Sequence, residues 1–184
     1  MSKAVMLSIR PKWVQKIANG EKTIEVRKTR PKLDTPFKCY IYCTLQGCNE
    51  FFRVDLGGDV AKWNRGKWAD RKGKVIGEFT CDRIDRLAPA NEPYGIYDID
   101  DDYVLQTCLE NGALWDYGHG TPLYGWHISD LRIYDTPKEL SEFKTLCRVD
   151  ADCCACPYYN YTKMECDGRV IGRAPQSWCY VEEG

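Results

Sequence analysis

The start of the chain predicts a strand, a short helix and a turn in direct succession, and this order limits the fold more than any other feature. Residues 4–9 (AVMLSI) are a short apolar run that suits a buried strand. Pro11 stands where the first turn of a helix accepts proline, and apolar residues follow at helical spacing until Asn19 and Gly20 end the helix. The chain therefore starts by alternating β and α elements, which favours a mixed fold.

Residues 22–30 alternate in the manner of a β-strand. Ile24 and Val26 would face a core, whereas Glu25 and Arg27 would share the opposite face, because successive strand side chains point to opposite sides. The stretch GEKTIEVRK is therefore either a solvated strand edge or a site.

The remaining patterns predict three more strands, over residues 37–44, 73–87 and 125–134. A second helix is expected over residues 100–112, with an acidic first turn and with Asn111 and Gly112 at its end. We therefore expect an α+β domain, a small β-barrel with flanking helices, over residues 1–140.

The charge of the chain is strongly polarised. A net charge of −1 argues against a uniformly basic nucleic-acid coat protein, yet residues 1–32 hold nine Lys and Arg against two acids. A second basic segment interleaves cations with Trp63 and Trp68, as in a groove that tracks phosphates and stacks bases. Its candidate phosphate ligands are Lys62, Arg65, Lys67, Arg71 and Lys72. The alternative is a solvated insertion whose tryptophans pack onto the barrel.

Cysteine usage and hydropathy bear on the compartment. No apolar run approaches the roughly 20 residues of a membrane span, and no secretory signal precedes the first strand. We expect a cytoplasmic protein with no membrane partner. Because export is not indicated and the eleven cysteines are odd in number, we interpret them as thiols or metal ligands.

Residues 141–184 are expected to form a cysteine-rich C-terminal extension packed on the barrel. Four thiolates could hold a structural zinc ion there, namely those of Cys153, Cys156, Cys166 and Cys179. The second C-x-x-C pair of a zinc ribbon is absent, so packed reduced thiols, or disulfides formed after purification, stay open as alternatives.

Residues 20–27, GEKTIEVR, match the pattern G-x-K-x-x-E-x-R and resemble the ASCH domain of the PUA-like superfamily. The segments LSIRPKWVQKIANG, FKCYIYCT and WHISDLRIYDTPKEL are also similar to that family, particularly to phage, prophage and gut Firmicutes forms. The resemblance covers about residues 1–140 and implies a β-barrel linked to RNA.

The preferred hypothesis is RNA or nucleotide binding in a cavity at this motif, with Gly20, Lys22, Glu25, Arg27 and Trp13 as ligand-binding residues. Arg offers a rigid donor fork, Glu accepts from exocyclic amines, and Lys supplies a point charge. The alternative to a binding site is that Glu25 and Arg27 form an exposed ion pair of little energetic value and that Lys22 is solvated.

Whether the protein is an enzyme stays open. The superfamily that the chain resembles includes one branch that hydrolyses the acyl amide of N4-acetylcytidine. It also includes members that have been proposed as ribonucleases. Lys22 matches the lysine of that branch, but Glu25 stands in the place of its threonine, so Lys22 and Glu25 are catalytic candidates only if the protein is an enzyme. A phage-encoded adaptor that binds a host protein is a further alternative.

Overall fold

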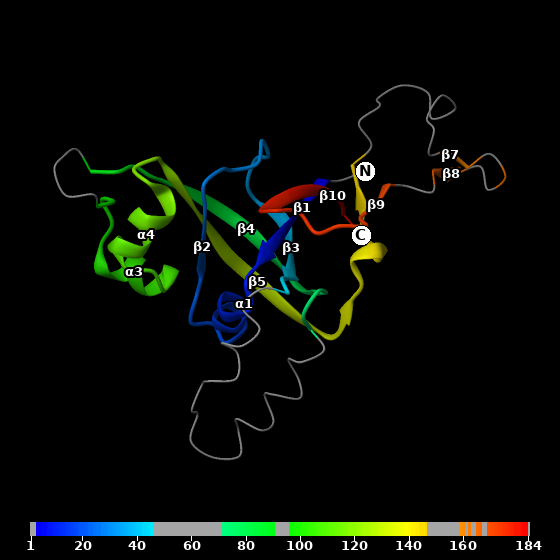
Figure 1. The fold of residues 1–184 in the computed structure, drawn as a ribbon, viewed down its shortest axis with the longest axis horizontal. Coiled ribbons are helices and arrows are strands. Elements are labelled where there is room, and N and C mark those ends of the chain that lie inside the picture. Colours follow the sequence, from blue (N-terminus) through cyan, green and yellow to red (C-terminus); the bar gives the residue numbers. More distant parts are fainter. Residues whose placement is uncertain are drawn as a thin grey trace, which may run out of the picture.

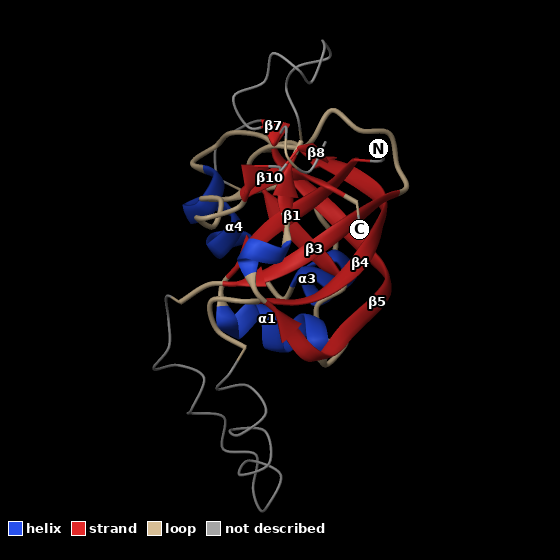
Figure 2. Ribbon diagram, turned by 90° about the vertical axis from the view of Figure 1, so that its right-hand side faces the viewer, coloured by secondary structure: helices blue, strands red, loops and turns tan. Residues whose placement is uncertain are grey.

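The computed structural model describes residues 3–45, 71–90, 96–146, 159–160, 162, 165–166 and 169–183. In this part of the chain, eight strands form one curved sheet in the order β2-β5-β4-β3-β1-β10-β6-β9 (Figures 1 and 2). The sheet is mixed, because β1 runs parallel to β3 and antiparallel to β10. A separate pair joins β7 to β8.

The strands and helices have the following bounds. The first half holds β1 (Lys3–Ile9), α1 (Pro11–Ala18), β2 (Ile24–Arg27), β3 (Phe37–Cys43) and β4 (Val75–Leu87). Next come α3 (Asp101–Thr107), α4 (Asn111–Gly118), β5 (Leu123–Lys138), the 3-10 helix η2 (Leu140–Glu142) and β6 (Lys144–Thr145). The last strands are β7 (Tyr159–Asn160), β8 (Glu165–Cys166), β9 (Arg169–Val170) and β10 (Trp178–Glu182). The predicted α+β class and the predicted first helix are confirmed.

The prediction of one helix over residues 100–112 is wrong, because two helices occupy this region. Asp100 caps α3 by accepting a hydrogen bond from the Tyr103 amide at 2.8 Å, and Cys108 ends the helix in the left-handed conformation, with φ of 53°. Asn111 then begins α4 instead of ending α3. Its side chain accepts from the Tyr97 amide at 2.7 Å and donates to the Tyr97 carbonyl at 3.2 Å, which fixes the start of α4.

The expected barrel is not closed. In the described residues β2 pairs with β5 on one side only, so its other edge makes no backbone ladder with β1 or β10. Side chains cross this gap instead: Trp178 donates to the Thr29 hydroxyl at 2.9 Å, and the Tyr180 hydroxyl accepts from the Lys32 amide at 2.7 Å. The fold is therefore a curved sheet with an opening between β2 and β1.

The main core lies inside the curvature of the sheet. It joins Val14 and Ile17 of α1 to apolar residues of the central strands. Cys39, Ile41 and Cys43 belong to it together, as the alternation of residues 37–44 predicts. The cysteines of the described residues whose side chains are placed are free thiols.

The C-terminal residues contribute to this same sheet. β10 pairs with β1 from Lys3↔Glu182 to Leu7↔Trp178, and β6 joins β10 to β9. The boundary between residues 140 and 141 stays a prediction, since most of the cysteine-rich segment lies outside the described residues. No helix in the described part of the chain is long and apolar enough to cross a membrane.

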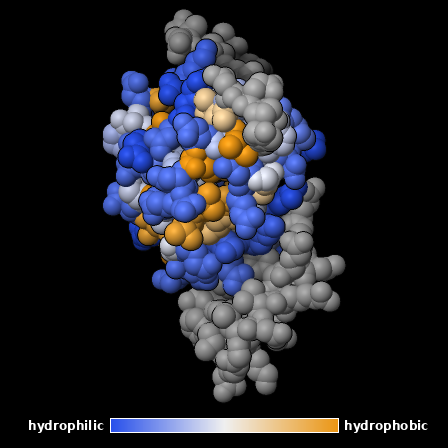
Figure 3. Space-filling model, turned by 90° about the vertical axis from the view of Figure 1, so that its left-hand side faces the viewer, coloured by the Kyte–Doolittle hydropathy of each residue, from blue (hydrophilic) through white to orange (hydrophobic). Residues whose placement is uncertain are grey.

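Helices α3 and α4 lie together on one side of the sheet, beside β2 (Figure 1). The amide of Thr23 donates to the Gln106 carbonyl of α3 at 2.9 Å, which ties this helix to the start of β2. On this side the surface is mostly hydrophilic around a smaller apolar area (Figure 3). The two helices thus lie beside β2, and α3 holds the start of this strand.

Replacing Gly77 with alanine should lower the free energy of unfolding by about 1–3 kcal/mol. A Cβ at this position of β4 would stand 2.5 Å from the carbonyl oxygen of Arg132 and 3.2 Å from the Cα of Ile133. Because both are backbone atoms of β5, the strands must separate. Urea unfolding would measure the loss.

The matched control is Gly112→Ala, since a Cβ there meets nothing within 4 Å and alanine suits the first turn of α4. Equal stability of the two variants would show that β4 and β5 are not packed as described.

Candidate functional site

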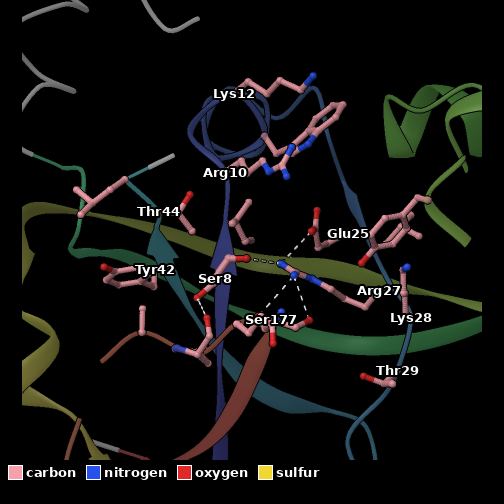
Figure 4. A pocket seen from close by; sticks show the side chains of 18 of the residues that line it. Ser8, Arg10, Lys12, Glu25, Arg27, Lys28, Thr29, Tyr42, Thr44 and Ser177 are labelled. Atoms are coloured by element: carbon pink, nitrogen blue, oxygen red, sulfur yellow. Dashed lines mark hydrogen bonds and ion pairs between the residues drawn. The ribbon is translucent and has the colours of Figure 1, made fainter. Parts of the chain in front are cut away.

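A pocket opens at the gap between β2, the end of β1 and the segment before β10 (Figure 4). Its volume is about 1400 Å³. Residues from the N-terminal strands, from α4 and from the C-terminal segment line it together. The missing backbone ladder therefore coincides with a cavity that three distant parts of the sequence enclose.

Lys22 lies at the base of this pocket and is 2% exposed. Its ammonium donates to the Thr107 carbonyl at 2.6 Å and stands 3.5 Å from Oε2 of Glu25. The ammonium also lies 5.1 Å from the centre of the Trp13 ring. Burial lowers the pKa of Lys22 from its ordinary value, while the Glu25 carboxylate opposes this shift.

Glu25 and Arg27 share one face of β2, as the alternation predicts. They are 6% and 7% exposed, and Nη2 of Arg27 stands 3.1 Å from Oε1 of Glu25. One carboxylate oxygen thus faces Lys22 and the other faces Arg27. The bland alternative of an exposed pair beside a solvated lysine is wrong, because all three side chains are buried.

Arg27 also connects β2 to the two segments across the gap. Nη2 donates to the Ser8 carbonyl at 2.9 Å, and Nη1 lies 3.4 Å from the Ser177 hydroxyl and 3.5 Å from its carbonyl (Figure 4). The Nε atom is buried without a hydrogen-bond partner among the described residues. The guanidinium therefore holds the pocket together and still has one donor unused.

The pocket wall carries far more positive than negative charge. Among the described lining residues Glu25 is the sole carboxylate. The cations are Arg10, Lys12, Lys22, Arg27, Lys28 and Arg173. Such a concentration of one sign attracts an anionic ligand.

Two aromatic rings border the same side of the pocket. Trp13 comes from α1 and has the Lys12 ammonium 4.6 Å from its ring centre, while Tyr117 comes from α4 and has Lys28 at 5.0 Å. Burial raises the pKa of Tyr117, and the nearby Arg27 partly offsets that rise. The phenol therefore stays a neutral hydrogen-bonding group beside the cations.

The structure brings together four of the five predicted ligand-binding residues, since Trp13, Lys22, Glu25 and Arg27 all line the pocket. Gly20 does not line it. With φ of 76° it makes the turn after α1, a conformation that favours glycine.

The second basic segment, which is predicted to bind phosphates, lies only partly within the described residues. Lys62, Arg65 and Lys67 lie outside the described residues. Arg71 is 4% exposed and donates to the Asp135 carbonyl at 3.3 Å, and neither it nor Lys72 lines the pocket. The burial of Arg71 argues against a direct phosphate contact.

The zinc hypothesis stays a prediction. Cys153 and Cys156 lie outside the described residues, as does the side chain of Cys166. Cys179 packs against an apolar cluster, and burial raises the pKa of its thiol to about 11. The described residues contain no group of three or more side chains suited to a metal ion.

The sequence reasoning missed the partners that complete the site. Ser177 stands 150 positions from Arg27, and Thr107 stands 85 positions from Lys22. Both use ordinary polar or backbone atoms, so no motif marks them. Arg10 and Lys28 belong to residues 1–32, and the excess of Lys and Arg in that segment is the sequence signal for this part of the pocket.

Comparison with solved structures identifies neighbours of this fold. The crystal structure of ASCH from Zymomonas mobilis matches with a TM-score of 0.57 and 16% identity, over 98% of this chain and 88% of that one. Two single-residue variants of the Zymomonas mobilis protein match with TM-scores of 0.54, at 16% and 15% identity. These cover 99% and 98% of this chain and 92% and 89% of theirs. No protein-family model and no curated protein matches the sequence. The fold is thus ASCH-like.

Replacing Arg27 with glutamine should destabilise the fold by about 3 kcal/mol or more. The variant leaves the buried Glu25 carboxylate with Lys22 as its one cation, and it removes the hydrogen bond from Arg27 to the Ser8 carbonyl. Chemical denaturation would measure the loss. Arg30→Gln is the matched control, because Arg30 is exposed just after β2. Similar stabilities of the two variants would contradict a bridging role for Arg27.

The buried Lys22 also predicts a pH dependence of stability. Its folded pKa is lowered, so between that value and about 10.4 the unfolded chain binds more protons than the folded one, and stability rises with pH. The unfolding free energy of the wild type relative to that of Lys22→Met should therefore increase as pH rises through this range towards pH 10, with a slope of at most about 1.4 kcal/mol per pH unit.

Lys16→Met is the control, because the Glu21 hydrogen bond raises the pKa of Lys16. The stability that Lys16 contributes is fully present below its unfolded pKa and is lost only as pH rises through the folded one. Its variant should therefore differ from the wild type by a constant amount over the same window. A flat difference for Lys22→Met would show that Lys22 is not buried.

Proposed function

We propose that this protein binds RNA, or a nucleotide derived from RNA, in the pocket at the open edge of β2. The observation that carries this proposal is the buried set Lys22, Glu25 and Arg27 beneath a cationic rim. A set of buried charges is costly unless it stabilises the fold or a ligand. Together with an ASCH-like fold, it favours a nucleic-acid ligand over an uncharged one.

The base of the pocket offers a hydrogen-bonding pattern that suits a nucleobase edge. Each oxygen of Glu25 faces one cation, which leaves further lone pairs to accept from exocyclic amines. Lys22 and Arg27 supply donors for base oxygens or ring nitrogens. Trp13 and Tyr117 supply rings at the same end, and single-stranded RNA is usually bound through bases stacked on aromatics.

The rim cations would hold the phosphates. Arg10, Lys12 and Lys28 are exposed and line the pocket. Each phosphate contact of this kind releases counterions, so binding should weaken as salt rises. This dependence separates RNA binding from the protein-adaptor alternative, in which an apolar interface would respond little to salt.

A second candidate is hydrolysis of a modified nucleoside or cleavage of RNA. The lowered pKa of Lys22 favours it, because a lysine acts as a base only when its pKa is pulled down. Lys22 and Glu25 would then activate a water molecule in the pocket. The phage or Firmicutes affiliation and a cytoplasmic location stay predictions.

Fluorescence anisotropy of labelled single-stranded RNA, at low and near-physiological salt, tests the proposal. The wild type should bind, with weaker affinity at higher salt, and the double variant Lys22→Met/Glu25→Gln should lose at least about tenfold in affinity. The physical reason is the loss of a donor and of a charged acceptor at the base of the pocket, each hydrogen bond to a charged group contributing about 1.5–3 kcal/mol.

The matched control is Lys16→Met/Glu21→Gln, which makes the same chemical change in an exposed ion pair with N–O distance 3.1 Å. It should bind as the wild type does. No binding by the wild type, or equal losses in both double variants, would remove the proposed role of the pocket. Turnover of acylated nucleosides or RNA by the wild type, lost in Lys22→Met, would favour the hydrolase instead.

A further inference from the structure

The pocket has two halves that meet at the connection between Arg27, Ser8 and Ser177 (Figure 4). On one side lie the buried charges of β2 with Trp13 and Tyr117. On the other side lie Tyr42 and Thr44, at the end of β3, together with the segment 172–175. We call this second side the Thr44 half. The proposed function uses only the first side.

The Thr44 half contains polar groups that the fold itself does not use. The hydroxyl of Thr44 is buried and has no hydrogen-bond partner among the described residues. Arg173 is exposed on the pocket wall, and no carboxylate of the described residues pairs with it. A buried hydroxyl without a partner costs free energy, which a ligand acceptor would recover. Arg173 lines the same pocket, and its positive charge favours an anionic acceptor.

The size of the pocket agrees with a ligand that extends past one nucleoside. Pockets for single small molecules are usually about 300–1,000 Å³. This pocket is about 1400 Å³. A nucleoside on the β2 side would leave the Thr44 half open to the next unit of a chain.

The C-terminal segment forms the wall of the Thr44 half, and it is held firmly. The Ser8 hydroxyl donates to the Pro175 carbonyl at 2.6 Å, and the Ser8 amide donates to the Ser177 carbonyl at 2.9 Å. These bonds fix the backbone next to Arg173 against the end of β1. The wall is therefore a built part of the pocket, and residue 173 has a defined place beside it.

We propose that the Thr44 half is a second nucleotide subsite, in which Arg173 and the Thr44 hydroxyl bind the phosphate that links two nucleotides and Tyr42 borders the second base or sugar. This inference rests on the proposed function and narrows its ligand. The protein binds an RNA segment of at least two nucleotides and discriminates against free nucleosides.

Calorimetric titration with ribonucleosides, dinucleoside monophosphates and trinucleotides of each base tests this subsite. The wild-type chain should bind the best dinucleoside monophosphate at least about tenfold more tightly than the corresponding nucleoside, because the linking phosphate gains charge-assisted hydrogen bonds. Arg173→Gln and Thr44→Val should each reduce the increase in affinity from nucleoside to dinucleoside monophosphate. Neither variant should change the affinity for the nucleoside. Unchanged nucleoside binding also shows that each variant is folded.

Arg132→Gln is the matched control, because Arg132 is an exposed arginine of β5 outside the pocket. This variant should keep the full increase in affinity from nucleoside to dinucleoside monophosphate. Equal affinity of the wild type for nucleosides and dinucleotides would overturn the subsite while leaving the proposed function in place. An equal loss of dinucleotide affinity in Arg132→Gln and Arg173→Gln would also overturn the subsite. Failure of the wild type to bind any of these ligands would overturn the proposed function and the subsite with it.

Discussion

The guanidinium of Arg27 is the contact on which both the shape of the sheet and the pocket depend. It replaces a backbone ladder between β2 and β1 with donors to the Ser8 carbonyl and to Ser177. A side chain can bridge strands that stand too far apart for backbone hydrogen bonds. The space that remains between the strands is the pocket. Arg27 therefore both connects β2 to β1 and lines the site.

The charge of Arg27 explains the arrangement of the other two members of the set. A buried guanidinium needs a counterion, and Glu25 provides it from the same face of β2 at 3.1 Å. The second oxygen of Glu25 then faces Lys22, whose ammonium also donates to a backbone carbonyl of α3. The three side chains are thus placed by one another and by α3, and a ligand would meet donors and acceptors that are already oriented.

The sequence predicts the half of this site that lies within one strand. Alternation alone puts Glu25 and Arg27 on the same face, and the spacing to Lys22 makes contact feasible. The partners from Thr107 and Ser177 depend on how distant segments pack, which no local pattern encodes. The same limit explains two wrong expectations. Barrel closure depends on the separation of β2 and β1, and the break between α3 and α4 depends on a left-handed Cys108 and on the bonds of Asn111 to Tyr97.

An open strand edge normally exposes unpaired backbone groups to solvent or to another chain. Here the edge of β2 is protected by being inside a pocket whose walls come from β1, α4 and the segment before β10. That protection requires the C-terminal segment, because Ser177 and Trp178 reach β2 and the loop after it. The end of the chain therefore does more than extend the sheet: it positions Arg27, forms one wall of the pocket and carries Arg173 to that wall, so ligand binding and the packing of the C-terminal segment should be coupled.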